Sequence, residues 1–202
     1  MSAYDETGQP LNVAALLRKM AEGWQPEFLF FWGHKPKRHP GPGKHVFSQW
    51  WPAAFKIDGG RYPTAEHYMM AEKVRLFGDR DMLERIRRAA DPAEAKKLGR
   101  KVRGFDAERW EAVAFDRVVS GNLAKFGQNP SLKAYLLATG DKVLVETSPL
   151  DKIWGIGLAA GDPHASNPAE WQGQNLLGFA LMAVRAELAR GRLTSPHQCE
   201  NG

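Results

Sequence analysis

The sequence predicts one mainly helical α+β domain with a few short strands. The chain has 202 residues, of which 43% are hydrophobic and 25% are charged, which is typical of a globular domain with a core of its own. Helix start and stop signals recur from residue 63 onward, whereas strand-like runs are short and few. We therefore expect helices to form most of the core.

The N-terminal part predicts one helix and short strands. "NVAALLRKM" (12–20) has the spacing of a short amphipathic helix. "FLFFWG" (28–33) indicates an aromatic strand, and the loop at 34–45 is rich in proline, glycine and basic residues. The run 46–63 indicates a strand and then a turn at 58–60.

Six helices are predicted in the rest of the chain, each with a recognisable boundary. Their first residues or N-caps are Thr64, Arg80, Asp91, Asp106, Asn129 and Leu176. Pro92 and Glu94 complete a capping box, and Gly191 ends the last helix. "KVLVETS" (142–148) is the best strand in this half, and 148–175 reads as a loop throughout.

We divide the chain into an N-terminal extension with a short helix (1–27), a main domain (28–191) and a disordered tail (192–202). The loop 148–175 is long for a compact domain, and such loops are functional or disordered. Its two tryptophans argue against disorder, so we expect it to be functional.

The charge pattern favours polyanionic partners. The net charge is +5 and the isoelectric point is near 9.4, which favours nucleic acid or phosphorylated ligands. Much of the positive excess lies at 85–103, a stretch that contains eight basic residues and only two acidic ones. This stretch is either a solvated helical face or a flank that attracts phosphate.

Composition excludes several classes of protein. No apolar run approaches the roughly 20 residues of a membrane helix, and the N-terminus lacks the order of a signal peptide. Cys199 is the single cysteine and lies in the polar tail, which excludes an internal disulfide and a thiolate metal cluster. We expect a cytoplasmic protein without a membrane partner; its oligomeric state stays open.

Motifs for common cofactors are also missing. The sequence contains no phosphate loop, no dinucleotide fingerprint, no H-E-x-x-H and no G-x-S-x-G. The six histidines show no metal-ligand pattern. We therefore expect neither a metal nor another cofactor.

The helix that opens at "TAEHYMMAEKV" carries two candidate functional charges. Glu66 and Lys73 are seven residues apart, so they share a face about 10 Å apart along the axis. That is too far for a simple ion pair. They are either solvated charges off the apolar stripe, or groups that point into a cleft and flank a ligand. The stripe consists of His67, Met70, Val74 and Phe77.

Tryptophans supply candidate stacking surfaces. There are seven, which is high for this length. Trp50 and Trp51 are adjacent, and Trp154 lies in "DKIWGIG" between an acid and two glycines, where the backbone can approach a ligand closely. Each tryptophan, Trp110 included, either packs in the core or stacks on a flat ring such as a base.

Several motifs together resemble one family. They are "YPTAEHYMMAEKVRLFGD", "KKLGRKVRGFD", "KFGQNPSLKAYLLATGDKVLVETSPLDKIWGIGL" and "WQGQNLLGFALMAVR", in this order. With them the chain resembles the YbiA-like, or NADAR, family over residues 28–190. The resemblance implies a single YbiA-like domain that acts as an N-glycosidase and hydrolyses a ribose C1–N bond.

Two substrate classes follow from the resemblance. One branch of the family acts on phosphoribosylamino-pyrimidines, which are riboflavin-biosynthesis intermediates, and another removes ADP-ribose from guanine in nucleic acid or nucleotides. "FFWGH" and "SQWWPAAF" look more like the second branch. A third possibility, from another class, is a non-catalytic module that binds ADP-ribose or nucleic acid.

The resemblance also implies site residues. It points to Glu66, Trp110, Asp151 and Trp154, and Lys73 and Lys125 occupy motif positions. We expect Glu66, Lys73 and Asp151 to be catalytic. The expected substrate-binding residues are Trp32, Gly33, His34, Gln49, Trp50, His67, Arg100, Trp110, Lys125, Trp154, Gly155 and Asn175.

Two chemical schemes fit these residues. Lys73, if its pKa is depressed, can attack the ring-opened imine of a ribosylamine and form a Schiff base that water resolves. In direct hydrolysis, one carboxylate acts as a base and another as its electrostatic partner. Glu66 moves protons and Asp151 faces the ribose in either scheme, and neither requires a cofactor.

Overall fold

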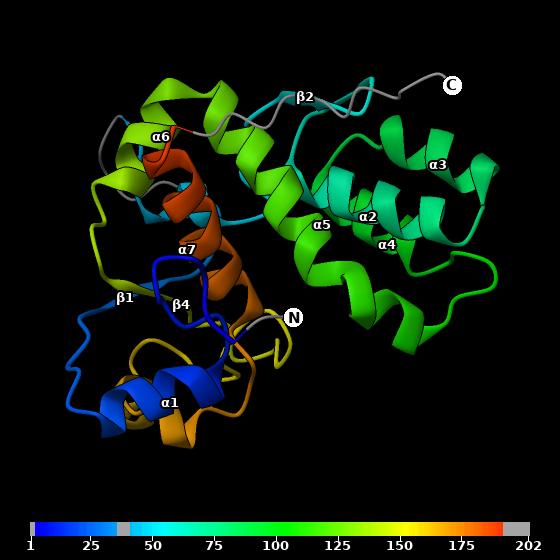
Figure 1. Cartoon of the computed structure of the whole chain (residues 1–202). Coiled ribbons are helices and arrows are strands. Elements are labelled where there is room, and N and C mark those ends of the chain that lie inside the picture. Colours follow the sequence, from blue (N-terminus) through cyan, green and yellow to red (C-terminus); the bar gives the residue numbers. More distant parts are fainter. Residues whose placement is uncertain (1–2, 36–40, 192–202) are drawn as a thin grey trace, which may run out of the picture.

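The structure is a computed structural model that describes residues 3–35 and 41–191 (Figure 1). Part of the predicted basic loop, 36–40, and the whole predicted tail, 192–202, lie outside the described residues. The helices are α1 Val13–Ala21, α2 Ala65–Leu76, α3 Arg80–Arg87, α4 Pro92–Gly99, α5 Ala107–Gln128, α6 Pro130–Leu137 and α7 Leu176–Ala189. The strands are β1 Phe28–Phe31, β2 Phe55–Ile57, β3 Gly60–Tyr62 and β4 Val143–Glu146. The predicted mainly helical α+β class is confirmed.

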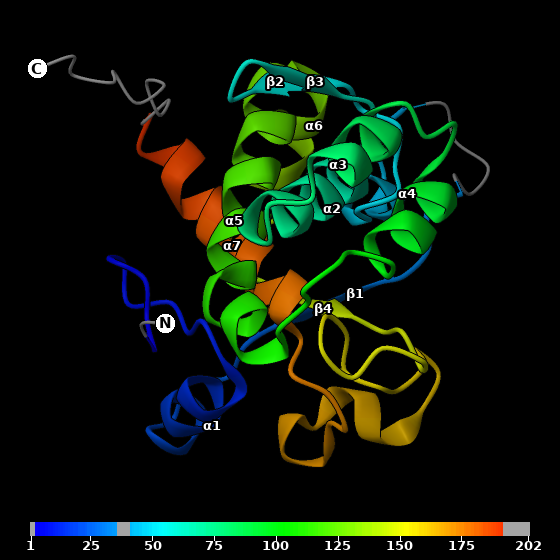
Figure 2. The same cartoon turned by 90° about the vertical axis from the view of Figure 1, so that its right-hand side faces the viewer.

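Helix α2 lies among three other helices. It packs against α3, α4 and α5, which Figure 2 shows around it. Thr64 caps it as predicted, since its hydroxyl accepts from the backbone N–H of His67. Nine of its twelve residues are buried, so the helix has no solvated face along its first two turns. The interpretation of Glu66 as a solvated charge is therefore wrong.

A two-stranded parallel sheet holds the other side of the core. β1 pairs with β4 in a register that places Phe28 opposite Val143 and Phe31 opposite Glu146. Because the strands are parallel, both chains leave the sheet at the same edge. Helix α7 covers β4, and α5 packs on α7. The residues after β1 and after β4 thus start side by side.

The predicted turn at 58–60 joins β2 to β3 in an antiparallel hairpin. Asp58 and Gly59 both have positive φ, 50° and 68°, as a tight hairpin turn requires. The strand predicted from residue 46 begins only at Phe55, because Lys44–Phe47 forms a short 3-10 helix instead. The loop 148–175 likewise contains two short 3-10 helices, Pro163–Ser166 and Pro168–Glu170.

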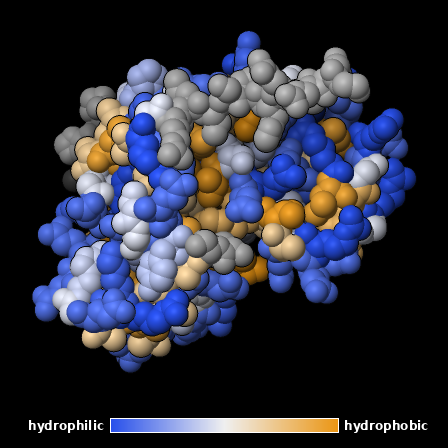
Figure 3. All heavy atoms as spheres, viewed as in Figure 1, coloured by the Kyte–Doolittle hydropathy of each residue, from blue (hydrophilic) through white to orange (hydrophobic). Residues whose placement is uncertain are grey.

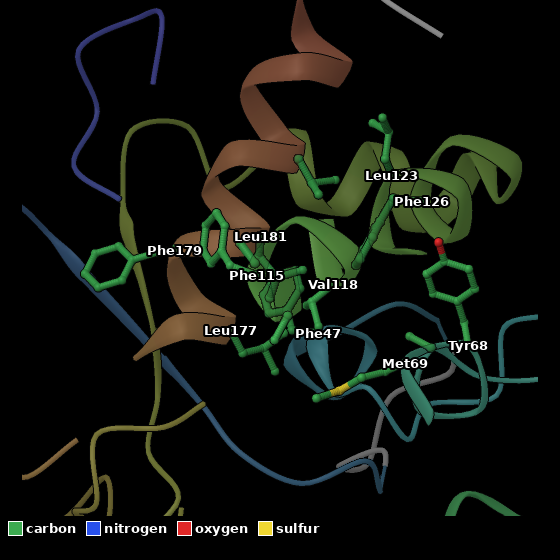
Figure 4. Packing of buried hydrophobic residues seen from close by; sticks show 14 of the residues in the cluster. Phe47, Tyr68, Met69, Phe115, Val118, Leu123, Phe126, Leu177, Phe179 and Leu181 are labelled. Carbon is green, nitrogen blue, oxygen red and sulfur yellow. The ribbon is translucent and has the colours of Figure 1, made fainter. Parts of the chain in front are cut away.

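Apolar side chains from distant segments meet in one core. Figure 4 shows Phe115 and Val118 of α5 beside Leu177 and Leu181 of α7, with Phe47 from the 3-10 helix next to them. The face seen in Figure 1 is mostly hydrophilic, with hydrophobic patches between the polar residues (Figure 3). Within residues 3–35 and 41–191, every helix is too short or too polar to cross a membrane.

The contact between α7 and β4 generates the first prediction. A Cβ added to Gly178 would lie 2.1 Å from the carbonyl oxygen of Leu144 and 2.5 Å from the side-chain nitrogen of Asn175. We expect Gly178→Ala to lower the free energy of unfolding by about 2 kcal/mol, because overpacking of about 1–3 kcal/mol exceeds the gain in helix propensity. Urea denaturation measures the change.

The matched control for this variant is Gly161→Ala. A Cβ at Gly161 has no atom within 4 Å, and its φ is not positive. This variant is expected to leave the unfolding midpoint unchanged. Equal stability of the two variants would contradict the close packing of α7 on β4.

Candidate active site

One cleft gathers most of the predicted site residues. It has a volume of ≈ 840 Å³ and is lined by residues of α2, α4 and α5 and by residues at and after the ends of β1 and β4. Eleven of the fifteen predicted residues line it, namely Trp32, Gly33, His34, Gln49, Trp50, Glu66, Lys73, Arg100, Trp110, Asp151 and Trp154. The family motifs, far apart in sequence, therefore converge on one surface.

Glu66 lies in the first turn of α2 and is only 5% exposed. Its backbone N–H donates to the carbonyl oxygen of Gln49 at 3.0 Å, which ties the helix to the 48–50 segment. Burial raises the pKa of its carboxyl to about 7, although Lys96 and the Trp50 side chain act in the opposite direction. A carboxyl with this pKa can accept or donate a proton near neutral pH.

A second carboxyl of the cleft, that of the half-buried Glu146, was not predicted. It is the last residue of β4 and lines the cleft. Burial, and then the charge of Asp151, raise its pKa to about 8. One signal in the sequence points to it: an acidic residue at the end of an apolar strand, next to the loop that carries Asp151.

Asp151 shapes the loop as well as the cleft. Its Oδ1 accepts the backbone N–H groups of Ile153 at 3.0 Å and Trp154 at 2.8 Å. This closes a turn that brings Trp154 to the cleft wall. The negative charge of Asp151 also raises the pKa of both Glu66 and Glu146. Asp151 therefore acts electrostatically on both glutamates of the cleft.

Three cations face these carboxyls. Burial and the charge of Arg100 lower the pKa of Lys73, whose Nζ lies 3.9 Å from the centre of the Phe105 ring. Lys96, which was not predicted, lines the cleft and lies 5.8 Å from the Trp50 ring. Arg100 follows α4 and lines the same wall.

Some residues of the basic stretch 85–103 lie at the cleft, where they can attract phosphate, and others lie on a solvated helical face. Lys96 and Arg100 line the cleft. Arg103 instead binds Asp79 at 2.8 Å, and Arg87 binds Glu84 at 3.3 Å on the surface of α3. Only part of the stretch is therefore available to attract a ligand in the cleft.

Aromatic side chains form much of the cleft wall. Trp110 is 8% exposed, so most of its ring packs in the core as well as lining the cleft. Trp50 and Trp154 are half-buried, and the ring of His34 lies 5.6 Å from that of Trp50. Trp32 is 61% exposed at the cleft. The flat ring of a ligand could therefore stack on any of several aromatic side chains in this cleft.

Four predicted substrate-binding residues lie outside the cleft lining and hold its walls. The ring nitrogens of His67 contact Thr64 Oγ1 at 2.7 Å and the carbonyl oxygen of Ala89 at 3.2 Å. A Cβ on Gly155 would lie 2.9 Å from the carbonyl oxygen of Glu146, so this glycine allows the loop to pack on β4. Both residues have structural partners in place of a ligand.

Lys125 and Asn175 are the other two. Lys125 is fully buried, and its ammonium donates to the carbonyl oxygens of Val46 at 2.7 Å and Ser48 at 2.9 Å. Burial lowers the pKa of Lys125 to about 7. Asn175 donates to the carbonyl oxygen of Leu144 and accepts the backbone N–H of Glu146, both at 2.9 Å. They fix the segments that carry Gln49 and Glu146.

Known proteins resemble the chain over most of its length. The NADAR domain family model matches residues 30–189. N-glycosidase R617 of Acanthamoeba polyphaga mimivirus is 44% identical over 80% of this chain and 96% of its own. N-glycosidase YbiA of Escherichia coli K12 is 37% identical over 69% of this chain and 77% of its own.

Two further matches concern a structure and a larger protein. The NMR structure of E. coli YbiA superposes with a TM-score of 0.67 at 30% identity and covers 88% of this chain and 94% of that chain. Riboflavin biosynthesis protein VVA0006 of Vibrio vulnificus is 34% identical over 74% of this chain but only 37% of its own length. The predicted resemblance is confirmed.

The buried carboxyl of Glu66 generates the second prediction. Its pKa is raised from 4.5 to about 7 in the folded protein. Between these values the folded state holds the proton more tightly, so this group's contribution to stability is complete below pH 4.5 and is lost as pH rises through 7. In wild type we expect the loss to approach about 3 kcal/mol by pH 8.

Glu66→Gln removes this titration. Relative to wild type, its free energy of unfolding should therefore increase between pH 5 and pH 8, as followed by urea denaturation at both pH values. Glu72→Gln is the control on the same helix, since Glu72 is buried but ion-paired with Arg75 and Arg117. Glu72→Gln is expected to be less stable than wild type, because it removes both ion pairs. If the stability of Glu66→Gln changed with pH in parallel with that of wild type, the raised pKa of Glu66 would be excluded.

Proposed function

We propose a substrate for this chain, which belongs to the NADAR domain family and is an N-glycosidase, a hydrolase of N-glycosyl bonds. The proposed reaction removes ADP-ribose from ADP-ribosylated guanine in nucleic acid or nucleotides. The observation that carries the proposal is the buried carboxyl of Glu66 in the cleft. Its pKa of about 7 suits a group that moves a proton during hydrolysis.

The size and lining of the cleft support a large anionic substrate. Its volume of ≈ 840 Å³ lies in the upper part of the range of about 300–1,000 Å³ that is usual for small-molecule sites. Lys73, Lys96 and Arg100 offer positive charge for a diphosphate. Trp50 and Trp154 offer faces for two bases, and ADP-ribosylguanine carries two bases and a diphosphate.

Direct hydrolysis needs a base and a stabilising charge. Glu66 takes a proton from water, and the water oxygen forms a bond to ribose C1 as the bond from C1 to the exocyclic nitrogen breaks. The nitrogen receives one proton and leaves as the free amine. Asp151 lies on the same cleft and would stabilise positive charge that develops at C1.

The Schiff-base scheme uses Lys73. Burial and Arg100 lower its pKa, which increases the neutral amine that can attack the ring-opened C1 imine. The substrate amine leaves, a Lys73–C1 imine forms, and water then releases the ribose aldehyde and regenerates the lysine. Lys125 fits this role less well, because its ammonium donates to two backbone carbonyls behind the wall.

The second candidate substrate is a phosphoribosylamino-pyrimidine. It also joins ribose C1 to an exocyclic amine, and a relative is named for riboflavin biosynthesis. That relative is matched over only 37% of its length, so its name covers a larger protein. A single phosphate and one small ring would leave much of the cleft and one of its cations without a partner.

The substrate proposal generates the third prediction. Purified protein is incubated separately with ADP-ribosylated guanosine and with the phosphoribosylamino-pyrimidine, and the released base is measured by mass spectrometry. We expect turnover of the guanine substrate and at least ~100-fold less turnover of the pyrimidine. The pyrimidine substrate has no diphosphate to pair with the cleft cations and no second base to stack, and together these missing contacts are worth more than about 3 kcal/mol. Release of the pyrimidine alone would favour the second candidate.

Glu66→Gln separates an enzyme from a binding module in the same assay. Turnover is expected to fall by ~100-fold or more, the range for the loss of a general acid or base, while ADP-ribose binding measured by calorimetry persists. Glu72→Gln, which lies on the same helix outside the cleft lining, should keep turnover. Full activity of Glu66→Gln would remove this residue from the mechanism.

Borohydride trapping gives the fourth prediction. The reagent reduces an imine to a stable amine, so a Schiff base would appear as a covalent adduct in the intact-protein mass when substrate is present. If the Schiff-base scheme operates, an adduct appears with wild type and Lys96→Ala and none appears with Lys73→Ala. Absence of an adduct from wild type would leave direct hydrolysis as the mechanism.

A further inference from the structure

Glu146 carries a buried polar atom for which the protein supplies no partner. Its Oε2 is one of five buried side-chain polar atoms without a hydrogen-bond partner among the described residues, and it is the one of these that belongs to a cleft-lining residue. Buried polar atoms normally have a partner, so this one calls for a functional explanation. An atom of the substrate can supply the missing contact.

The backbone of Glu146 is held on both sides. Its N–H donates to Asn175 Oδ1 at 2.9 Å, and its carbonyl oxygen accepts from Ile156 at 2.9 Å. The strand register also places it opposite Phe31 at the end of β1. The base of the side chain is therefore fixed, and a fixed group is suited to proton transfer at one place.

Charges from three elements act on the Glu146 carboxyl. Asp151 on the loop and Glu66 on α2 are acidic and favour its protonated form, whereas Lys96 on α4 favours the ionised form. Burial adds to the effect of the two acids. Burial and the two neighbouring acids therefore favour a proton on Glu146 near neutral pH.

We propose that Glu146 is a further catalytic residue, a general acid whose carboxyl gives its proton to the exocyclic nitrogen that leaves ribose C1. This inference rests on the proposed N-glycosidase reaction and assigns the proton that direct hydrolysis requires. Glu66 takes one proton from the attacking water, and Glu146 gives one to the departing nitrogen. Transfer of a proton from Glu66 back to Glu146 then restores both groups, so the cycle needs no further reactant.

The test combines a pH profile with a change of leaving group. Wild type should lose kcat/KM as pH rises above about 8, where Glu146 ionises. Glu146→Gln keeps the shape of the side chain but has no proton to give, so kcat/KM should fall by ~100-fold or more and the alkaline decline should disappear. A residue that only holds the cleft in shape would lower kcat/KM and leave the alkaline decline in place.

A substrate that needs no acid sharpens the result. ADP-ribose with para-nitrophenolate at C1 has a leaving group that departs without a proton, so Glu146→Gln should lose less than ~10-fold on it, while Glu66→Gln loses activity on both substrates. Glu72→Gln, buried and ion-paired away from the cleft lining, is the control and should match wild type. Equal losses of Glu146→Gln on both substrates would overturn the assignment.

A readout without substrate separates this inference from the proposed substrate. Infrared difference spectra of the free protein between pH 6 and pH 9 should show two carboxyl groups losing their protons in wild type and Glu72→Gln, Glu66 near pH 7 and Glu146 near pH 8. In Glu146→Gln the component that titrates near pH 8 should be missing, and in Glu66→Gln it should persist. A component near pH 8 that persists in Glu146→Gln and disappears in Glu66→Gln would place the retained proton on Glu66 and overturn the role of Glu146. If the guanine substrate is not hydrolysed, the kinetic test is repeated with whichever substrate is.

Discussion

The burial of carboxyl groups in the cleft wall is the constraint on which the rest of the structure depends. A carboxylate removed from water is costly unless other charges or donors compensate. Glu66 is placed in the first turn of α2, where the helix dipole favours a negative charge. Lys96 and Arg100 add positive charge from α4 and its end. The packing of α4 against α2 is thus part of the chemistry as well as of the core.

Polar side chains that end on backbone groups hold this wall in place. Lys125 of α5 donates hydrogen bonds to the carbonyl oxygens of Val46 and Ser48, just before Gln49. These bonds fix the backbone of a segment that has no strand partner among the described residues. Asn175, with a left-handed φ of 54°, bridges the backbone of Leu144 and Glu146. Such buried donors have few alternative partners, so their loss would leave carbonyls unsatisfied. The positions of Gln49 and Glu146 in the cleft wall therefore depend on backbone anchors outside the cleft lining.

Local signals in the sequence predicted the helices well, because caps such as Thr64 and Asp106 act within a single turn. Periodicity correctly identified His67, Met70 and Val74 of α2 as buried, but it could not show that Glu66 is buried too, since the first two turns of the helix have no solvated face. The sequence also cannot distinguish a polar residue that binds backbone from one that binds a ligand. His67 and Lys125 were therefore predicted as ligand contacts, while Glu146 stayed hidden at the end of a strand whose parallel partner lies 112 or more residues away along the chain.

The three carboxyls and their neighbouring cations explain how one cleft can hold an acid and a base together. Asp151 raises the pKa of both Glu66 and Glu146, and Lys96 lowers the pKa of both. Glu66 also raises the pKa of Glu146. Under the proposed function, a diphosphate substrate adds negative charge and draws on the cations that now oppose those shifts. Both effects favour protonation. The proton that the leaving amine needs would then be retained most firmly when the substrate is bound, at the point in the cycle where hydrolysis uses it.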